Sequence, residues 1–211
     1  MSERLPLFPL GIVALPSELV PLHIFEERYR TMIGEGLENE SEFGIVWVAD
    51  DGLKATGCAC EVSQVLERLP DGRMNIVCRG TRSFRLVEQV GDDPYPAAVV
   101  EWLDDKPEPV DRATLTAAQE AYNDLVEQAT DEPAEPARVA AMSADEMAAT
   151  VDFGLEAKQG LLDLRSENGR LRLLTRLFRA AIKRLEYAER AQERAQSNGK
   201  LRFGPAGLAG S

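Results

Sequence analysis

The first apolar stretch of the chain, residues 5–25, is interrupted by four prolines (LPLFPLGIVALPSELVPLHIF). Proline lacks the amide hydrogen that a central strand donates, so this stretch predicts short extended pieces joined by turns. A helix is expected from about Glu26, because acidic residues in a first turn suit the helix dipole. Its apolar positions are predicted at Phe25, Tyr29, Met32 and Ile33, and its end at Gly34 and Gly36.

From residue 43 to residue 103 apolar and polar residues alternate, a pattern typical of half-buried strands. Strands are predicted over residues 43–48, around 58–62 and 74–78, and over 83–90 and 97–103. The run Leu69-Pro70-Asp71-Gly72 favours a tight turn, since Pro fixes φ and Gly accepts a positive φ. The strands on either side of it are therefore predicted to form a hairpin. Gly80 is expected to break the pattern of the second of them.

Strand signals stop at residues 104–109 (DDKPEP), which predict a linker. Beyond it, helices are predicted over residues 111–129 and 155–164, with a proline-rich break at 131–137. Ser143 and Glu146 have the spacing of a capping box, in which the two side chains satisfy free amides at a helix start. The second half of the chain is therefore predicted to be helical.

The last predicted helix has two different faces. One face carries Leu171, Leu174, Phe178, Ile182 and Leu185. The opposite face carries Arg172, Arg176, Arg179, Lys183, Arg190 and Arg194. Together these patterns predict an α+β protein with an antiparallel β-domain over residues 1–105, a helical bundle over 106–197 and a flexible tail over 198–211.

Charge is distributed unevenly along this acidic chain, whose formal net charge is -12. Residues 1–110 hold 10 Lys or Arg against 20 Asp or Glu, whereas residues 170–203 hold 10 basic and 3 acidic residues. An acidic surface repels nucleic acid and anionic membranes. The basic helix face has three interpretations: a solvated face with pairs to Glu186 and Glu193, a docking site for the acidic first domain or an acidic partner, or a nucleic-acid site.

Histidine and cysteine, which often act as bases, nucleophiles or metal ligands, are few in this chain. His23, the only histidine, lies in an apolar stretch, and a hydrolase would need a nucleophile beside it. Cys58, Cys60 and Cys78 fall short of the four ligands of a structural zinc site, so they are expected to pack in the core. The chain has no phosphate-binding GxxxxGK[ST] motif. No metal, cofactor or enzymatic activity is predicted.

Neither a signal peptide nor an apolar run approaching the roughly 20 residues of a membrane span is present, so a cytoplasmic protein is expected. The odd number of cysteines gives no disulfide framework, which agrees with a reducing compartment.

The order of these signals resembles the substrate-binding domain at the N-terminus of Lon-type proteases. The resemblance rests on LPLFPLGIVALPSELVPLHIFEERYRTMI, LERLPDGRMNIVCRGTRSFRL, YPAAVVEWLDD and LEAKQGLLDLRSENGRLRLLTRLF. It extends over about residues 5–187, and it implies a PUA-like β-barrel followed by a helical bundle. The ATPase and Ser-Lys peptidase of that family are not implied for this chain.

The resemblance implies a non-enzymatic module that binds unfolded polypeptide or a protein partner, with a protease acting in trans among the candidates. Three sets of residues are predicted to contact a partner: Arg28 and Tyr29 on the early helix, Trp47 and Trp102 on strands, and Arg172, Arg176, Arg179 and Lys183 on the last helix. The alternative function is RNA binding through the basic helix, because PUA-like barrels of other families bind RNA. A small hydrolase using His23 is the third hypothesis, and the oligomeric state stays open.

Overall fold

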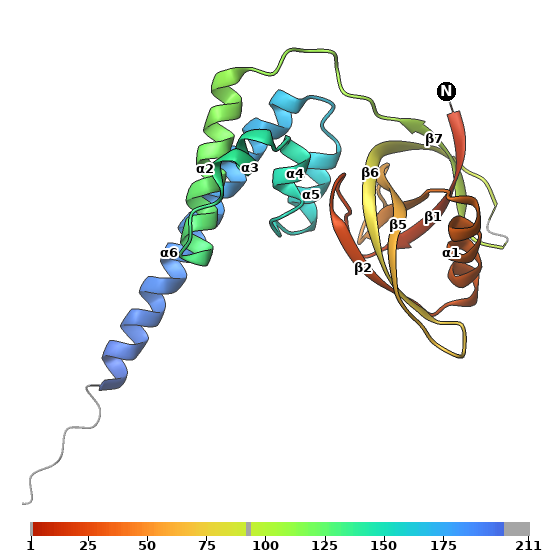
Figure 1. Ribbon diagram of the computed structural model, residues 1–211, viewed down its shortest axis with the longest axis horizontal. Helices are drawn as coiled ribbons and strands as arrows, with labels where there is room; N and C mark the ends of the chain where they lie inside the picture. Colours follow the sequence, from red (N-terminus) through yellow and green to blue (C-terminus); the bar gives the residue numbers. More distant parts are fainter. Residues whose placement is uncertain (1, 92–93, 201–211) are drawn as a thin grey trace, which may run out of the picture.

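Among the described residues, seven strands form the first half of the molecule and five helices form the second half, with one more helix, α1, beside the strands (Figure 1). The computed structural model describes residues 2–91 and 94–200. The strands are β1 (Ser2–Leu10), β2 (Leu19–Ile24), β3 (Phe43–Ala49), β4 (Gly52–Leu53), β5 (Thr56–Arg68), β6 (Met74–Gln89) and β7 (Ala97–Trp102). The helices are α1 (Glu27–Asn39), α2 (Arg112–Thr130), α3 (Pro136–Ala141), α4 (Ala144–Ala148), α5 (Leu155–Leu162) and α6 (Glu167–Lys200).

The strands close into a barrel. Their order is β1-β7-β6-β5-β3-β4, and β1 also pairs with β3, which joins the two ends of the sheet. The β1–β3 pairing is parallel, whereas the other strand pairs are antiparallel. β2 lies outside this ring and pairs with β6. Closure removes the open edges of β1 and β3, but β2 remains an edge strand among the described residues.

The predicted hairpin is confirmed. β5 and β6 pair from Thr56 opposite Arg85 to Arg68 opposite Met74. At the turn, the Gly72 amide donates to the Leu69 carbonyl at 2.9 Å, and Gly72 takes the positive φ of +86° that glycine accepts most easily.

The prediction that α1 ends at Gly34 and Gly36 is wrong. The helix continues to Asn39, because Leu37 prolongs the buried face begun by Met32 and Ile33. Phe25 does not join that face: it precedes the N-cap residue and is 60% exposed.

The prediction that Gly80 breaks the strand pattern is wrong, because Gly80 lies within the continuous strand β6. The loop before β2 crosses the strand there, since the Ser17 amide donates to the Gly80 carbonyl at 2.8 Å and the Gly80 amide donates to the Glu18 carbonyl at 2.9 Å. A Cβ on Gly80 would lie 2.0 Å from the carbonyl oxygen of Leu15. Glycine is therefore needed for close approach of two backbones rather than for a positive φ.

The three cysteines lie in the barrel interior, each 0% exposed, and the prediction of core packing is confirmed. Cys78 donates to the Val20 carbonyl at 3.4 Å. Its hydrogen bond with Cys60, together with burial, holds the pKa of the Cys78 thiol well above its ordinary value. In the part of the chain that is described, no group of three or more His, Cys, Asp or Glu side chains is arranged to hold a metal ion.

In the helical half, α2 packs along α6 (Figure 1). Leu171, Leu174 and Phe178 of α6 are fully buried, and the Phe178 ring lies 5.4 Å from that of Tyr122. The capping box of Ser143 and Glu146 is confirmed at the start of α4. The short helix α3 occupies part of the segment expected to be a break, with Pro136 in its first turn, where no amide donor is needed. Of the predicted tail, residues 201–211 lie outside the described residues.

Arg170, 8% exposed, holds the linker to the helices. Its guanidinium donates to Asp105 of the linker at 2.8 Å and to Glu167 at 2.8 Å, and its Nε lies 3.3 Å from a carboxylate oxygen of Asp145 on α4. Burial raises the pKa of Asp145 to about 6, although the charge of Arg170 opposes that shift. One cation thus joins the linker, α4 and α6.

Gly80→Ala is expected to lower the free energy of unfolding by about 3 kcal/mol, because its Cβ meets backbone that cannot move without distorting the barrel. Gly34→Ala is the matched control, since no atom lies within 4 Å of its added Cβ and alanine favours a helix by up to about 1 kcal/mol. Urea unfolding of both variants measures the difference. Equal midpoints would contradict the close approach at Gly80.

Arg170→Leu is expected to cost about 3–5 kcal/mol of stability at pH 7, because Asp105, Asp145 and Glu167 lose their shared cation. Exposed Arg172→Leu is the control and should cost under about 1 kcal/mol.

The loss of folding stability caused by Arg170→Leu should become smaller as the pH falls from 7 to 4. Leucine removes the positive charge that opposes the raised pKa of Asp145, so this folded-state pKa rises further and protonation of Asp145 then favours the folded state. In the unmodified protein the raised pKa of Asp145 acts in the same direction: its contribution to stability is lost as the pH rises through about 6. Urea unfolding across this pH range measures both effects, and a penalty independent of pH would contradict the assignment.

Candidate functional site

The predicted partner-contacting residues lie on separate parts of the molecule. Arg28 and Tyr29 are on α1, Trp47 is on β3, Trp102 is on β7 and the basic residues are on α6. The structure therefore does not join them into one surface, and each region has its own surroundings.

Arg28 and Tyr29 differ in exposure. Arg28 is exposed, pairs with Glu26 at 3.0 Å and has its guanidinium 4.6 Å from the centroid of the Tyr29 ring. Tyr29 is only 5% exposed, and its ring lies 4.1 Å from that of Phe8 in the barrel core. Helical spacing turns Tyr29 toward the same side as Met32, so it supports the core rather than a partner-binding surface.

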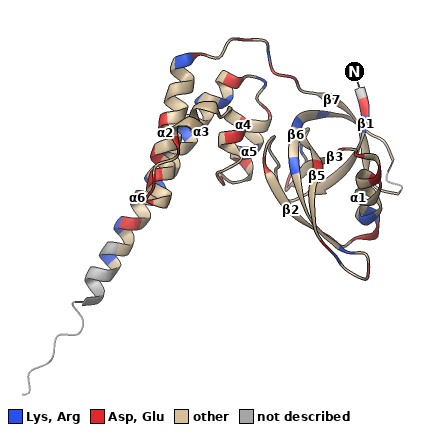
Figure 2. Ribbon diagram, viewed as in Figure 1, with Lys and Arg blue, Asp and Glu red and all other residues tan. Residues whose placement is uncertain are grey.

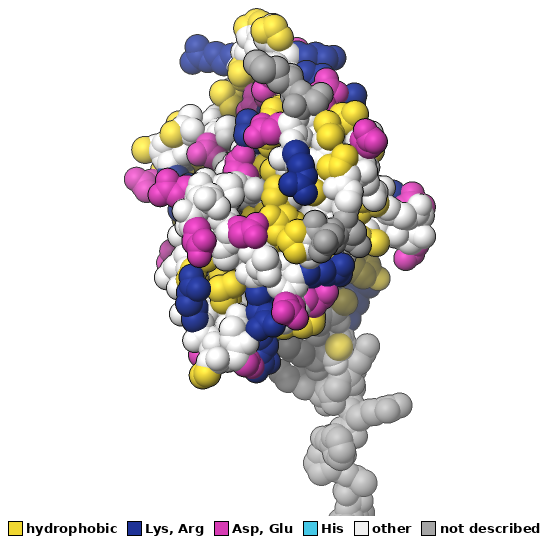
Figure 3. Space-filling model, turned by 90° about the vertical axis from the view of Figure 1, so that its right-hand side faces the viewer, with side chains coloured by type: hydrophobic (Ala, Val, Ile, Leu, Met, Phe, Trp, Pro, Cys, Tyr) yellow, Lys and Arg dark blue, Asp and Glu magenta, His cyan; other side chains and the backbone are white. Residues whose placement is uncertain are grey.

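An exposed apolar groove follows β2 and the end of the β5–β6 hairpin. It has a volume of about 600 Å³, and Pro21, His23 and Leu66 are among its lining residues. Leu66 is 55% exposed, and the Phe25 ring stacks 6.0 Å from that of His23. We call the set Pro21, His23, Phe25 and Leu66 the β2 surface. On another face of the barrel half, seen in Figure 3, hydrophobic side chains lie between charged residues of both signs.

The sequence analysis did not identify Phe25 and Leu66 as exposed apolar residues of the β2 surface, although the pattern around Leu66 indicates it. Val65 and Leu66 are adjacent apolar residues in an otherwise alternating strand, and the β5–β6 register shifts between Val65 and Glu67. A shift of this kind turns an apolar side chain to the solvent face.

His23 is exposed, and its Nδ1 lies 2.6 Å from the side-chain oxygen of Asn75. The side-chain nitrogen of Asn75 donates to Glu67 at 2.9 Å. An amide is neither a nucleophile nor a base. Among the described residues, the contacts of His23 therefore supply no nucleophile–base pair of the kind that hydrolysis requires.

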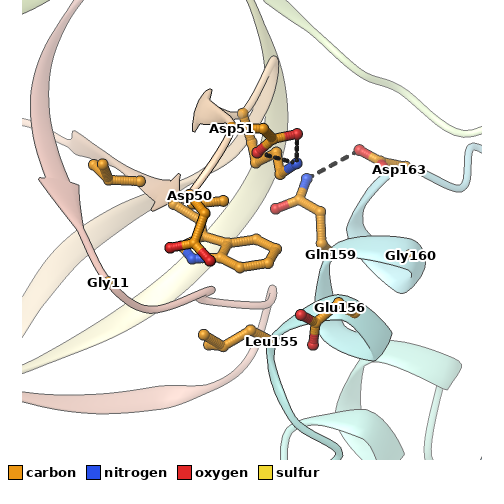
Figure 4. Close-up of a pocket in the computed structure, with 12 residues that line it drawn as sticks. Gly11, Asp50, Asp51, Leu155, Glu156, Gln159, Gly160 and Asp163 are labelled. Atoms are coloured by element: carbon orange, nitrogen blue, oxygen red, sulfur yellow. Dashed lines mark hydrogen bonds and ion pairs between the residues drawn. The ribbon is translucent and has the colours of Figure 1, made fainter.

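A cleft of about 710 Å³ separates the barrel from α5, and Trp47 lines it (Figure 4). We call it the interlobe cleft. It is lined by Gly11, Trp47, Val48, Ala49, Asp50, Asp51, Lys54, Leu155, Glu156, Gln159, Gly160 and Asp163. Lys54 binds both carboxylate oxygens of Asp51, at 2.8 and 2.7 Å, and its ammonium lies 5.3 Å from the centroid of the Trp47 ring.

Gln159 of α5 is the buried polar residue of this cleft, with 7% exposure. Its amide nitrogen donates to the Thr56 carbonyl at 3.2 Å and to Asp163 at 3.1 Å, while its Oε1 has no hydrogen-bond partner. The nitrogen contacts only acceptors, so the orientation of the amide is determined. A buried acceptor left unpaired costs about 1–3 kcal/mol.

The barrel and the bundle are held together beside the cleft. Lys158 of α5 forms an ion pair with Glu18 in which both side chains are largely buried, and it also donates to the Val13 carbonyl at 3.4 Å. With the bond from Gln159 to Thr56, these contacts fix α5 against the barrel. The interlobe cleft is therefore formed by the fold itself.

Trp102 is already engaged within the chain. The guanidinium carbon of Arg82 lies 3.5 Å from the centroid of its ring, and Arg82 pairs with Glu42 at 2.8 Å. The indole nitrogen of Trp102 donates to Glu3 at 2.9 Å. One face of the indole ring and its only donor are thus occupied.

The four basic residues predicted to contact a partner, Arg172, Arg176, Arg179 and Lys183, are all exposed on α6. Arg172 and Arg176 line a groove of about 700 Å³ between α2 and α6. Farther along, Arg190 pairs with Glu186 at 3.1 Å, and Figure 2 shows both signs of charge along the bundle. Acidic side chains thus lie among the basic ones along this helix.

None of the helices described is long and apolar enough to cross a membrane.

Comparison with known proteins gives consistent matches. Two solved structures share the fold: a Lon N-terminal domain protein from Xanthomonas campestris (TM-score 0.62, 24% identity, covering 82% of this chain and 96% of that one) and the N-terminal domain of a Mycobacterium avium complex Lon protease (TM-score 0.59, 19% identity, 83% and 98%). The prediction of an α+β fold, a PUA-like barrel followed by helices, is confirmed.

Among curated relatives, the Lon protease of Parabacteroides distasonis is 29% identical over 122 residues, which are 53% of this chain and 15% of that protein. The Lon protease of Roseiflexus castenholzii is 27% identical over 209 residues, 92% of this chain and 26% of that protein. The chain thus spans about a quarter or less of these two relatives. The family model described as the ATP-dependent protease La (LON) substrate-binding domain matches residues 4–180, and the chain belongs to that family.

Proposed function

We propose that this chain is a non-enzymatic module that binds extended, unfolded polypeptide at the β2 surface. The observation that carries the proposal is the strand β2, which the described residues pair on one edge only, with exposed Phe25 and Leu66 nearby. An extended peptide adds to such an edge through backbone hydrogen bonds, while its side chains enter neighbouring apolar hollows. The groove lined by Pro21, His23 and Leu66 is such a hollow.

The expected affinity for each segment is low. Burying an exposed Phe or Leu side chain contributes at most about 1.5–3 kcal/mol, and ordering a disordered segment opposes it. Pro21 also removes one backbone donor from β2. Weak, sequence-tolerant contacts of this kind suit a protein that recognises unfolded chain rather than one defined partner.

The contacts of His23 also support binding rather than catalysis, because an amide partner leaves the imidazole without a group to activate. We place this activity in the cytoplasm, which agrees with the three free cysteines. A protease acting in trans would be the natural recipient of the captured polypeptide.

Phe25→Ser combined with Leu66→Ser is expected to weaken binding of a fluorescently labelled, permanently unfolded protein by about tenfold or more, because two apolar anchors are lost. Fluorescence anisotropy of the labelled protein measures the affinity. The matched control is Val87→Ser with Val110→Ser, which removes two other exposed apolar side chains, 58% and 48% exposed, away from β2.

The α6 triple variant Arg172→Glu, Arg176→Glu and Arg179→Glu should leave polypeptide binding unchanged, whereas the alternative function predicts that it abolishes salt-dependent RNA binding. No polypeptide binding at high micromolar concentration, or equal loss in the valine control, would overturn the proposal.

A further inference from the structure

The two tryptophans of this chain, Trp47 and Trp102, both lie near cations and carboxylates, but the cation over each ring differs. Around Trp102 a guanidinium lies on the ring and a carboxylate, Glu42, holds that guanidinium. Trp47 also lies beside carboxylates, and the ammonium of Lys54, which Asp51 binds, lies over its ring at the longer distance of 5.3 Å from the centroid. Trp102 therefore has a guanidinium stacked closely on its ring, whereas the cation recorded over Trp47 is a more distant ammonium.

From this geometry we infer that the interlobe cleft binds the guanidinium group of an arginine side chain presented by a polypeptide. The electron-rich face of Trp47 attracts a planar cation, and guanidinium stacks on indole better than ammonium does. The inference concerns a site separate from the β2 surface and does not rest on the function proposed for that surface.

Charge complementarity supports a cation rather than an anion. Four carboxylates line the cleft against the single ammonium of Lys54: Asp50, Asp51, Glu156 and Asp163. All four are exposed at its rim, where Asp50 and Asp51 come from the barrel side, Glu156 from α5 and Asp163 from the C-cap of that helix (Figure 4). A cation entering between the two walls is attracted from both sides.

Gln159 supplies an independent indication of the ligand. The residue is more than nine-tenths buried, and its unpaired Oε1 points away from Asp163, toward the Asp50 side of the cleft (Figure 4). An acceptor of this kind lacks a donor, and a guanidinium carries five N–H donors in one plane. The bond from Gln159 to Thr56 and the ion pair of Lys158 with Glu18 hold the cleft walls in place before any ligand binds.

The test uses N-acetyl-arginine amide as the probe with the full chain, followed by NMR of the two indole N–H signals. The Trp47 signal should move with a dissociation constant on the order of 1 mM, and the Trp102 signal should stay, because its ring and donor are engaged. N-acetyl-citrulline amide, of the same shape without the charge, should bind at least about tenfold more weakly, and N-acetyl-lysine amide about threefold more weakly. A blocked arginine-containing tripeptide should bind at least as well as the single residue.

Variants of charged residues at the rim of the interlobe cleft test whether the ligand is a cation or an anion. Asp50→Asn with Glu156→Gln should weaken arginine binding about fivefold. The control, Glu120→Gln with Glu127→Gln, removes two exposed carboxylates of α2 that do not line the cleft, and it should change nothing. Lys54→Met should tighten binding about threefold, since it removes a competing cation.

Weaker binding in Lys54→Met would mean that the cleft selects an anion and would overturn the inference. So would equal shifts with arginine and citrulline, or a Trp47 signal that stays fixed at concentrations about tenfold above the expected constant. Phe25→Ser with Leu66→Ser should leave this binding intact, so failure at the cleft and failure at the β2 surface are told apart.

Discussion

The close contact between Gly80 and the loop before β2 is the constraint on which the arrangement of the two halves depends. Without a side chain at Gly80, residues 15–18 lie directly against β6 and exchange backbone hydrogen bonds with it. That position brings the Glu18 carboxylate to the Leu15 amide on one side and to Lys158 of α5 on the other. The helix, and with it the interlobe cleft, is therefore placed by a contact made inside the β-domain.

How far the sequence predicts this structure depends on the distance over which each contact acts. The hairpin turn at residues 69–72 and the capping box of Ser143 are determined by neighbouring residues, and both were predicted correctly. The parallel β1–β3 pairing and the cluster around Arg170 join residues far apart in the chain. The spacing of apolar residues along the sequence does not indicate such partners. Arg170 was therefore counted as one more basic residue of the last helix, although it is buried.

The candidate site shows the same limit more sharply. Trp47 and Trp102 occupy equivalent positions in the sequence pattern, each within an apolar strand, and both were predicted to contact a partner. Only their tertiary surroundings distinguish them. Arg82, itself paired with Glu42, stacks on the Trp102 ring and Glu3 accepts its indole N–H, whereas Trp47 lines the interlobe cleft. Phe25 was misplaced for a related reason: helical spacing extends back to it, but the helix begins after Glu26.

Apolar and cationic recognition on one module have complementary physical consequences. Burial of apolar surface is insensitive to moderate salt, whereas attraction between a cation and the exposed rim carboxylates is screened within about 10 Å at 0.1 M salt. Unfolded polypeptides expose both apolar and basic side chains, so one chain has groups suited to the β2 surface and to the interlobe cleft. Two weak contacts on one flexible chain combine with an effective concentration in the millimolar range, provided that the chain can span both sites. The net charge of -12 then has a direct role, since it favours approach of basic segments to a protein whose individual contacts are weak.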